Sequence, residues 1–292
     1  MTAGVRCLCM LASGMFVPGM VGCSSGSGKV VIRVEGSDTM VNLAQAWAEE
    51  YHKIHPDVQV QVSGGGSQVG ISSLIIGQCE LANASRRMKA KELRIAEKKT
   101  GRAPVEFIVG RDALAVYVHV ENPIEAIAIE ELAEIYGEGG TVTAWSQIAV
   151  ANTACSSNAI TCVSRQSNSG TYVYFRQAVL GKQRDFKDGS IQLSGSKDVV
   201  ALVATTPCAI GYSGMGYATD DVKTVPVAPS KGAPAVAPTV ENCQNGTYPI
   251  ARPLFIYTLG EPTGAVKDYL DWIMSAAGQE IVRKKGYVPV TE

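Results

Sequence analysis

The sequence predicts an α/β protein built on a mainly parallel β-sheet, and three observations support this. The chain has 292 residues, of which 46% are hydrophobic and 18% charged, so it can fill one large core or two medium ones. Short β-branched stretches alternate with stretches whose apolar residues repeat every three or four positions, and such strand–helix units form parallel sheets with right-handed crossovers. The 30 glycines predict many tight turns and loops whose backbone can approach a ligand.

The first two units follow from local patterns. Residues 30–35 are β-branched and short, which predicts a strand, and 37–39 can open a helix. The apolar positions of that helix run from Met40 to Ile54 at intervals of three or four residues. Residues 58–62 then alternate between apolar and polar, as a half-buried strand does.

The pattern continues through a third unit. A glycine-rich loop leads into a second helix that stops near Gly77, and a third strand is expected at 79–84. A highly charged helix at 89–99 has the composition of a solvated surface. The long extended run at 105–120 is expected to break at Gly110-Arg111-Asp112.

Charge and hydropathy exclude two classes of protein. The chain carries 26 Lys and Arg against 27 Asp and Glu, a formal charge of −1, and therefore lacks the basic excess of a nucleic-acid binder. No apolar run reaches the roughly 18 residues of a spanning helix, which argues against an integral membrane protein.

The N-terminus has the pattern of an export signal. Residues 1–22 combine Arg6 with an apolar stretch rich in small residues, which predicts a signal peptide. Cys23 follows a small residue and precedes a Ser/Gly tether that reaches residue 29, an arrangement similar to a bacterial lipoprotein signal in which Cys23 carries the lipid. In the alternative, an ordinary signal is cut nearby and Cys23 is not modified.

Five cysteines remain after the signal and the lipidated position, an odd number for an oxidising compartment. Cys155 and Cys162 flank a polar stretch that a disulfide could close, and Cys208 with Cys243 is a candidate second pair. Cys79 is expected to be a buried thiol. The spacings match no zinc pattern, so no metal is predicted.

Three loops share one position, after a strand and before a helix. They are 36–39, 64–67 and 165–171, and all are rich in Ser, Thr and Gly. Helix N-termini offer unpaired N–H groups and partial positive charge, and open α/β sheets bind ligands at the carboxyl ends of their strands. The loops therefore predict an anion site. The alternative is that Ser37, Ser67 and Ser169 only cap helices.

These loops carry a resemblance to a known family. Together with later segments they resemble the phosphate-binding proteins of bacterial phosphate ABC importers, from about residue 30 to the C-terminus. No single segment is specific, but their order and spacing are. The matching segments are Gly36-Ser37-Asp38-Thr39, Gly64-Gly65-Gly66-Ser67, Ala82-Asn83-Ala84-Ser85-Arg86, Arg165-x-x-x-Ser169-Gly170-Thr171, Ala209-Ile210-Gly211-Tyr212-Ser213, Tyr248-Pro249-Ile250-Ala251-Arg252-Pro253-Leu254 and the C-terminal stretch from Gly278 to Pro289.

The resemblance implies a two-lobed periplasmic-binding-protein type II fold, with mixed, mostly parallel sheets flanked by helices and the ligand in the cleft between the lobes. Lobe I would comprise 30–112 and 213–292, and lobe II would comprise 113–212. Two extended crossings near 110–112 and 211–213 would join them and allow hinge closure.

The resemblance also assigns the residues that bind phosphate. Arg165 would grip two phosphate oxygens with its planar, permanently charged fork. Asp38 would accept a hydrogen bond from the proton that phosphate keeps and sulfate lacks, which would exclude sulfate. Ser37, Asp38, Thr39, Ser67 and Ser85 would line the first lobe, and Arg165, Ser169, Gly170 and Thr171 the second.

One residue departs from the family pattern. Some members carry an Asp where this chain has Arg86, directly after Ser85. Arg86 would either contact the anion and alter the preference of the site, or form a structural bridge with Asp38 or Asp112.

The implied function is that of an exported receptor. It would bind inorganic phosphate between its lobes and deliver it to an ABC permease in the inner membrane. It would need no cofactor, catalyse no reaction, and act as a monomer anchored by lipid at the periplasmic or cell surface. The alternatives are a receptor for another tetrahedral oxyanion such as sulfate or molybdate, a phosphate sensor, and a phosphoester-hydrolysing relative.

Overall fold

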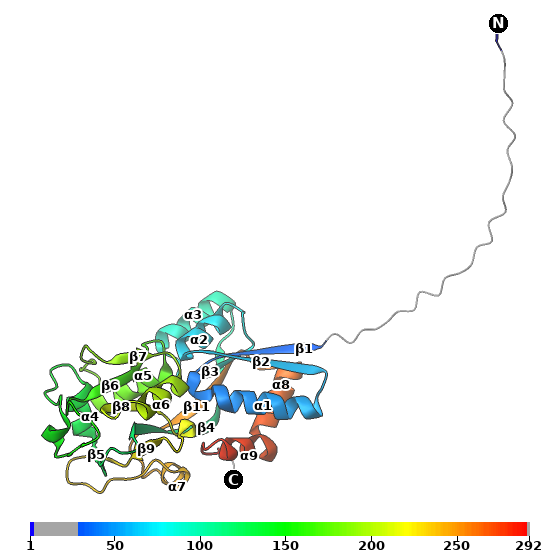
Figure 1. Ribbon diagram of the computed structural model, residues 1–292. Coiled ribbons are helices and arrows are strands. Elements are labelled where there is room, and N and C mark those ends of the chain that lie inside the picture. The colour runs from blue at the N-terminus through cyan, green and yellow to red at the C-terminus, as the bar shows by residue number, and fades with distance from the viewer. Residues whose placement is uncertain (3–28, 291–292) are drawn as a thin grey trace.

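One nine-stranded sheet runs through the molecule and curls from one end to the other (Figure 1). The computed structural model describes residues 1–2 and 29–290. Along the main path of the sheet the strand order is β2-β1-β3-β11-β4-β8-β6-β7, with β9 also paired to β4. Pairing is parallel among β1, β2 and β3 and among β6, β7 and β8, whereas the central strands β11 and β4 pair antiparallel. The expected mixed α/β architecture is confirmed.

Strand β4 (Pro104–His119) is common to both ends of the sheet. Its first half pairs with β11, and its second half pairs with β8 and β9. The predicted break at Gly110-Arg111-Asp112 is wrong, because β4 continues through these residues with a single register shift opposite Leu254 and Phe255.

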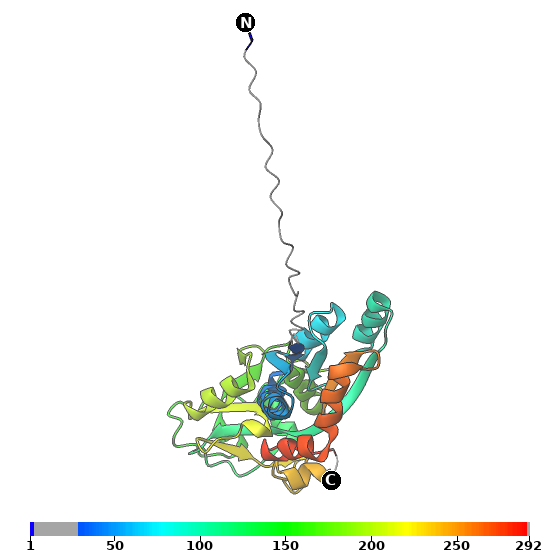
Figure 2. The ribbon, with the colours of Figure 1, turned by 90° about the vertical axis from the view of Figure 1, so that its right-hand side faces the viewer.

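The first lobe comprises residues 29–112 and 251–290, which surround a core that includes Ile32, Trp47, Leu254 and Tyr269. Helices α8 and α9 pack together and against α1, which Figure 2 shows almost end-on. The elements of this lobe, besides the first half of β4, are β1 (Val30–Gly36), a 3-10 turn (Asp38–Met40), α1 (Val41–Ile54), β2 (Val58–Gly65), α2 (Ser67–Ile75), β3 (Leu81–Ala84), α3 (Ala90–Thr100), β11 (Ala251–Leu259), α8 (Gly264–Met274) and α9 (Ala276–Lys284).

The second lobe comprises residues 113–250, around a core that includes Leu132, Trp145, Phe175 and Tyr212. Its elements, besides the second half of β4, are β5 (Ile127–Ala128), α4 (Ile129–Tyr136), a 3-10 turn (Trp145–Ile148), β6 (Thr161–Arg165), α5 (Gly170–Phe175) with a π-helical turn (Arg176–Leu180), β7 (Ile191–Leu193), α6 (Ser196–Ala204), β8 (Ala209–Gly214), a 3-10 turn (Met215–Tyr217), β9 (Val222–Val225), β10 (Val227–Ala228) and α7 (Val240–Gln244).

The chain returns to the first lobe later than predicted. Residues 213–250, expected in lobe I, belong to the second lobe, and Val225 and Tyr248 are buried in the same core as Leu132 and Tyr212. Strand β9 also pairs with the second half of β4. The second crossing is therefore the start of β11 at Ala251, and the segment 211–213 lies inside β8.

The disulfide differs from both predicted pairs. Cys155 is bonded to Cys208, whereas Cys162 and Cys243 are free and buried. Because β6 and β8 are parallel neighbours that pair Thr161 with Ala209, the residues before each strand come together. Cys79 is a buried free thiol as predicted, and burial raises its pKa to about 12.

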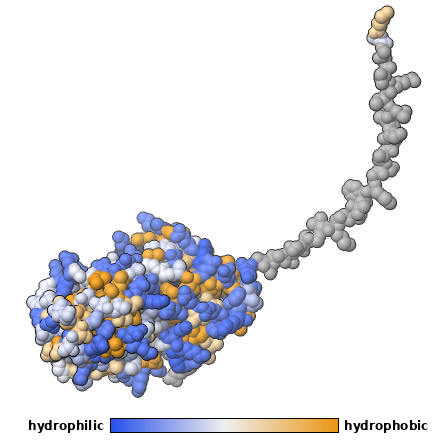
Figure 3. Space-filling view, viewed as in Figure 1, coloured by the Kyte–Doolittle hydropathy of each residue, from blue (hydrophilic) through white to orange (hydrophobic). Residues whose placement is uncertain are grey.

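The surface in Figure 3 mixes polar side chains with small groups of apolar ones, as is usual for a folded domain. In the part of the chain that the structure describes, no helix combines the length and apolarity needed to cross a membrane. The predicted signal peptide, Cys23 and the tether as far as residue 28 lie outside the described residues.

Candidate anion site between the lobes

The carboxyl ends of β1, β2 and β3 meet at one edge of the first lobe, where each strand passes into a loop. These loops carry Ser37 to Thr39, Ser67 and Ser85. Across the cleft, β6 ends at Arg165 and α5 begins at Gly170. The structure therefore brings the predicted loops of both lobes together, at the sheet edge where open α/β proteins bind ligands.

Three serines of the first lobe form a connected hydroxyl cluster. Ser37 Oγ donates to Ser85 Oγ at 2.9 Å, and Ser85 N donates to Ser67 Oγ at 3.0 Å. None of the three is more than 2% exposed. The hydroxyls of Ser37 and Ser67 do not cap helices, so the capping alternative is wrong for these two.

Capping is correct for Ser169, whose Oγ accepts a hydrogen bond from Thr171 N at 3.1 Å at the start of α5. The next residue, Gly170, lies against the serine cluster. A Cβ at Gly170 would lie 2.3 Å from Ser67 Oγ and 2.6 Å from Ser85 Oγ, so only glycine allows this approach.

The two lobes touch through paired threonines. Thr39 Oγ1 and Thr171 Oγ1 are 2.8 Å apart, and neither residue is more than 1% exposed. Asn168, which sequence reasoning missed, adds two contacts with the first lobe. Its Nδ2 donates to Gly65 O at 2.9 Å, and its carbonyl oxygen accepts from Gln68 N at 3.1 Å. The cleft is thus closed in this structure.

An ion pair also crosses the cleft. Arg165 Nη2 donates to Asp38 Oδ2 at 2.8 Å, and Arg165 Nη1 donates to Ser196 Oγ at 2.9 Å. Asp38 Oδ1 accepts from Gly65 N at 2.9 Å. Burial lowers the pKa of the Arg165 guanidinium, while the charge of Asp38 opposes that shift and the nearby Arg252 adds to it.

A second buried ion pair, between Arg252 and Asp112, lies at the junction of the lobes. Arg252 Nη2 and Asp112 Oδ2 are 2.9 Å apart, and their side chains are 1% and 0% exposed. The two residues are register partners on β11 and β4. Sequence reasoning did not assign Arg252, although it lies in a segment that carried the family resemblance, because nothing local indicates that this strand faces Asp112.

Arg86 forms neither of the predicted bridges. Its Nη1 and Nη2 donate to the two Glu92 carboxylate oxygens at 2.8 and 2.7 Å, and Glu92 lies six residues further along the chain, in the first turn of α3. Burial acts to raise the pKa of Glu92, but hydrogen bonds from Arg86 and the Lys89 backbone lower it below its usual value. Asp38 and Asp112 are held by other arginines.

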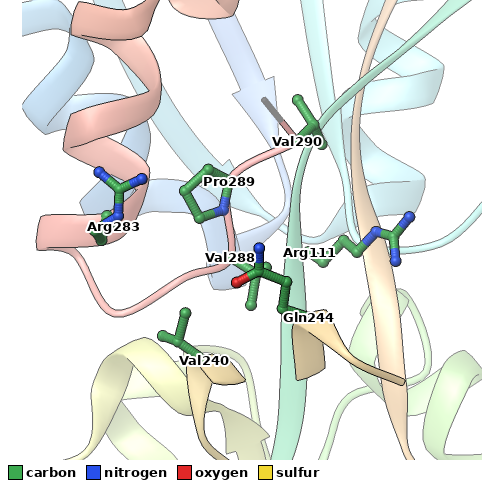
Figure 4. Close-up of a pocket in the computed structure, with 7 residues that line it drawn as sticks. All are labelled: Arg111, Val240, Gln244, Arg283, Val288, Pro289 and Val290. Atoms are coloured by element: carbon green, nitrogen blue, oxygen red, sulfur yellow. The ribbon is translucent and has the colours of Figure 1, made fainter. Parts of the chain in front are cut away.

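Figure 4 shows a pocket at another place, beside the C-terminal segment. None of the predicted site residues lines it, and Arg111 and Arg283 lie on opposite sides of Val288 and Pro289 without converging. In residues 29–290, no three His, Cys, Asp or Glu side chains are grouped as metal ligands would be.

Comparison with known proteins identifies the family. The PBP superfamily domain matches residues 24–277. The phosphate-binding protein PstS of Pseudomonas aeruginosa is 36% identical over 265 residues, which cover 87% of this chain and 81% of that protein. The chain belongs to the PstS family of phosphate-binding proteins.

Other PstS relatives agree with this assignment. PstS of Bacillus subtilis is 31% identical over 89% of this chain and 81% of its own length. A candidate phosphate ABC transporter substrate-binding protein from Clostridium perfringens, solved with bound phosphate, has a TM-score of 0.79 and 28% identity over 89% of this chain and all of that one. An ABC-type phosphate transport receptor from Vibrio cholerae gives a TM-score of 0.67 at 25% identity, covering 88% of this chain and 99% of that one.

Proposed function

We infer that this protein is the extracytoplasmic receptor of a phosphate ABC importer. It binds inorganic phosphate between its lobes and hands the anion to a membrane permease. The observation that carries this function is the convergence, in one closed cleft, of the Arg165 guanidinium with hydroxyls from both lobes. Membership of the PstS family supports the same conclusion.

The donors suit a small oxyanion. Hydroxyl groups donate without adding charge, and the fixed charge of Arg165 can engage two anion oxygens at once. Because Thr39 and Thr171 meet across the cleft, an anion that enters between them would accept from both lobes and hold them together. In this proposal the anion site between the lobes is also lined by Ser37, Ser67, Ser85, Ser169 and Gly170.

Asp38 is the proposed selectivity residue. Phosphate at neutral pH retains a proton that a carboxylate can accept, whereas sulfate would face an unpaired negative charge. Asp38 is held at the cleft by Gly65 N and Arg165. Arg86 also keeps its predicted contact with the anion in this proposal. The contact would use its buried Nε, which has no hydrogen-bond partner among the described residues.

The receptor acts without chemistry in this proposal: it binds and releases phosphate as a monomer. Export would use residues 1–22, and a lipid on Cys23 would tether the fold to the membrane through the Ser/Gly segment.

Calorimetric titration of phosphate-stripped protein, starting at Ser24, tests the function. We expect tight phosphate binding and no heat from sulfate. Equal binding of both anions, or sulfate binding alone, would replace phosphate with another oxyanion. If neither anion binds, the transport role is wrong and a sensor or phosphoesterase role must be considered.

A further inference from the structure

Arg252 contacts both lobes through one guanidinium. Nε and Nη2 donate to Asp112 Oδ2 at 3.1 and 2.9 Å, and Nη1 donates to Ser85 O at 3.3 Å. Nη2 also donates to Thr39 Oγ1 at 3.2 Å and to Thr171 Oγ1 at 3.0 Å. These two hydroxyls belong to opposite lobes, and Arg252 lies on the strand that joins them.

The contacts with the threonines determine how these hydroxyls can bond. A threonine hydroxyl can donate one hydrogen bond and accept others. When a guanidinium N–H points at its oxygen, the hydroxyl acts there as an acceptor, and its own proton must point elsewhere. Arg252 therefore turns the protons of Thr39 and Thr171 away from itself. One of these protons lies in the 2.8 Å hydrogen bond between the two hydroxyls, and an anion that entered between them would free it, so that both hydroxyls could donate to the anion.

The carboxylate of Asp112 fixes the guanidinium in this orientation. Asp112 is 0% exposed, and its second oxygen, Oδ1, accepts from Met215 N at 3.0 Å. The guanidinium also lies over the ring of Tyr174, with Arg252 Cζ 5.6 Å from the ring centroid. A planar guanidinium that donates through two N–H groups to one buried carboxylate oxygen and lies over an aromatic ring has little freedom to turn.

We propose that Arg252 is a positioning residue for phosphate, which orients the Thr39 and Thr171 hydroxyls as paired donors when the lobes close. This inference rests on the proposed phosphate function and adds to it a residue that acts through the two threonines. Lysine cannot replace arginine in this role, because a single ammonium cannot hold Asp112 and both hydroxyls in one plane.

A double-mutant cycle tests the proposal. Phosphate affinity is measured by calorimetry for the wild type, Arg252→Lys, Thr171→Val and the double variant, with Arg33→Lys as a matched surface control. Arg33 pairs with Glu80 at the surface, and its replacement should leave affinity unchanged. We expect Arg252→Lys to weaken phosphate binding about tenfold when Thr171 is present, but only about twofold in the Thr171→Val background. The two losses should not add, because Arg252 is proposed to act through the Thr171 hydroxyl, which the Val variant already lacks.

The outcomes are distinct. Wild-type protein that does not bind phosphate would overturn the proposed function itself. Wild-type binding with an unchanged Arg252→Lys variant would overturn the positioning role alone. Equal losses in both backgrounds would mean that Arg252 contacts the anion directly, which also overturns it. Should Arg252→Lys fail to fold, the pair Arg252→Gln with Asp112→Asn removes both buried charges together and enters the same cycle.

Discussion

Arg165 and Asp38, 127 positions apart in sequence, form an ion pair across the cleft with Nη2 and Oδ2 at 2.8 Å. The carboxylate that is proposed to recognise the phosphate proton is therefore already bonded to the guanidinium that is proposed to bind the phosphate oxygens. An incoming anion would compete with Asp38 for the same N–H groups of Arg165. Only an anion that binds these groups more strongly than Asp38 does would displace the carboxylate.

Substitution of this carboxylate should alter selectivity. Asp38→Asn keeps the shape of the side chain but supplies an amide that can donate to an oxygen of sulfate. We expect sulfate binding to become measurable, and phosphate binding to weaken about tenfold, because a charge-assisted hydrogen bond is lost. Calorimetry with both anions measures the change, and Asp271→Asn on exposed α8 is the control. Unchanged affinity for both anions would remove Asp38 from the site.

Gly170 should tolerate no side chain. In Gly170→Ala, the added Cβ would meet the Ser67 and Ser85 hydroxyls at 2.3 and 2.6 Å, so the lobes could not close to the present distance. We expect phosphate affinity to fall at least about a hundredfold, since several hydrogen bonds depend on closure. A Cβ at Gly139, in contrast, would meet no atom within 4 Å.

Gly139→Ala is therefore the control for Gly170→Ala. The positive φ of Gly139, 71°, means that its replacement should cost some stability but no phosphate affinity. Near-normal phosphate binding by Gly170→Ala would mean that the closed arrangement is not the binding form.

The disulfide should stabilise the second lobe. Cys155 and Cys208 are 53 positions apart, and closing a loop of that length stabilises a protein by about 4 kcal/mol. In urea unfolding, the double variant Cys155→Ser with Cys208→Ser should show a free energy of unfolding that is lower by this amount. Reductant should destabilise the wild type but not the double variant. If Cys162→Ala also removed the effect of reductant, the bond would have a different partner in solution.

The Arg86–Glu92 pair predicts a pH dependence of stability. The pKa of Glu92 lies below its usual value of 4.5 in the folded protein, so the pair stabilises the fold above that pH. The stabilisation is lost as the pH falls through the folded-state pKa. Glu92→Gln leaves Arg86 buried without a charged partner, and we expect it to lower the free energy of unfolding by about 3 kcal/mol at pH 7.

Urea unfolding at pH 7 and pH 3 measures this effect. The difference between the wild type and Glu92→Gln should shrink as the pH falls below 4.5 and through the folded-state pKa of Glu92, because protonation removes the negative charge from the pair. A difference that is the same at both pH values would show that the lost contact is not ionic.

The loop motifs of the anion site were predictable because each consists of residues that are adjacent in the sequence. The stretch from Ser37 to Thr39 and the stretch from Arg165 to Thr171 each follow a strand and begin a helix, so their place at the sheet edge follows from the strand–helix order. The family resemblance then added what each loop would bind.

Features that depend on pairing between distant strands were not predictable in this way. Arg252 meets Asp112 only because β11 and β4 are antiparallel neighbours, and Cys155 meets Cys208 because β6 and β8 are parallel neighbours. The short strands after Ser213 carried too little pattern to indicate the core on which they pack. The pairing of Glu92 with Arg86 was not predicted, because the charged residues of the helix at 89–99 were all expected to face solvent.

Strand β4 is a single unbroken ribbon of 16 residues that takes part in both halves of the sheet. The lobes are therefore not joined by a flexible linker at this point, because the same strand forms part of the sheet in each lobe. Opening the cleft must therefore bend or twist β4 between the half that pairs with β11 and the half that pairs with β8 and β9, so the backbone of this strand resists separation of the lobes.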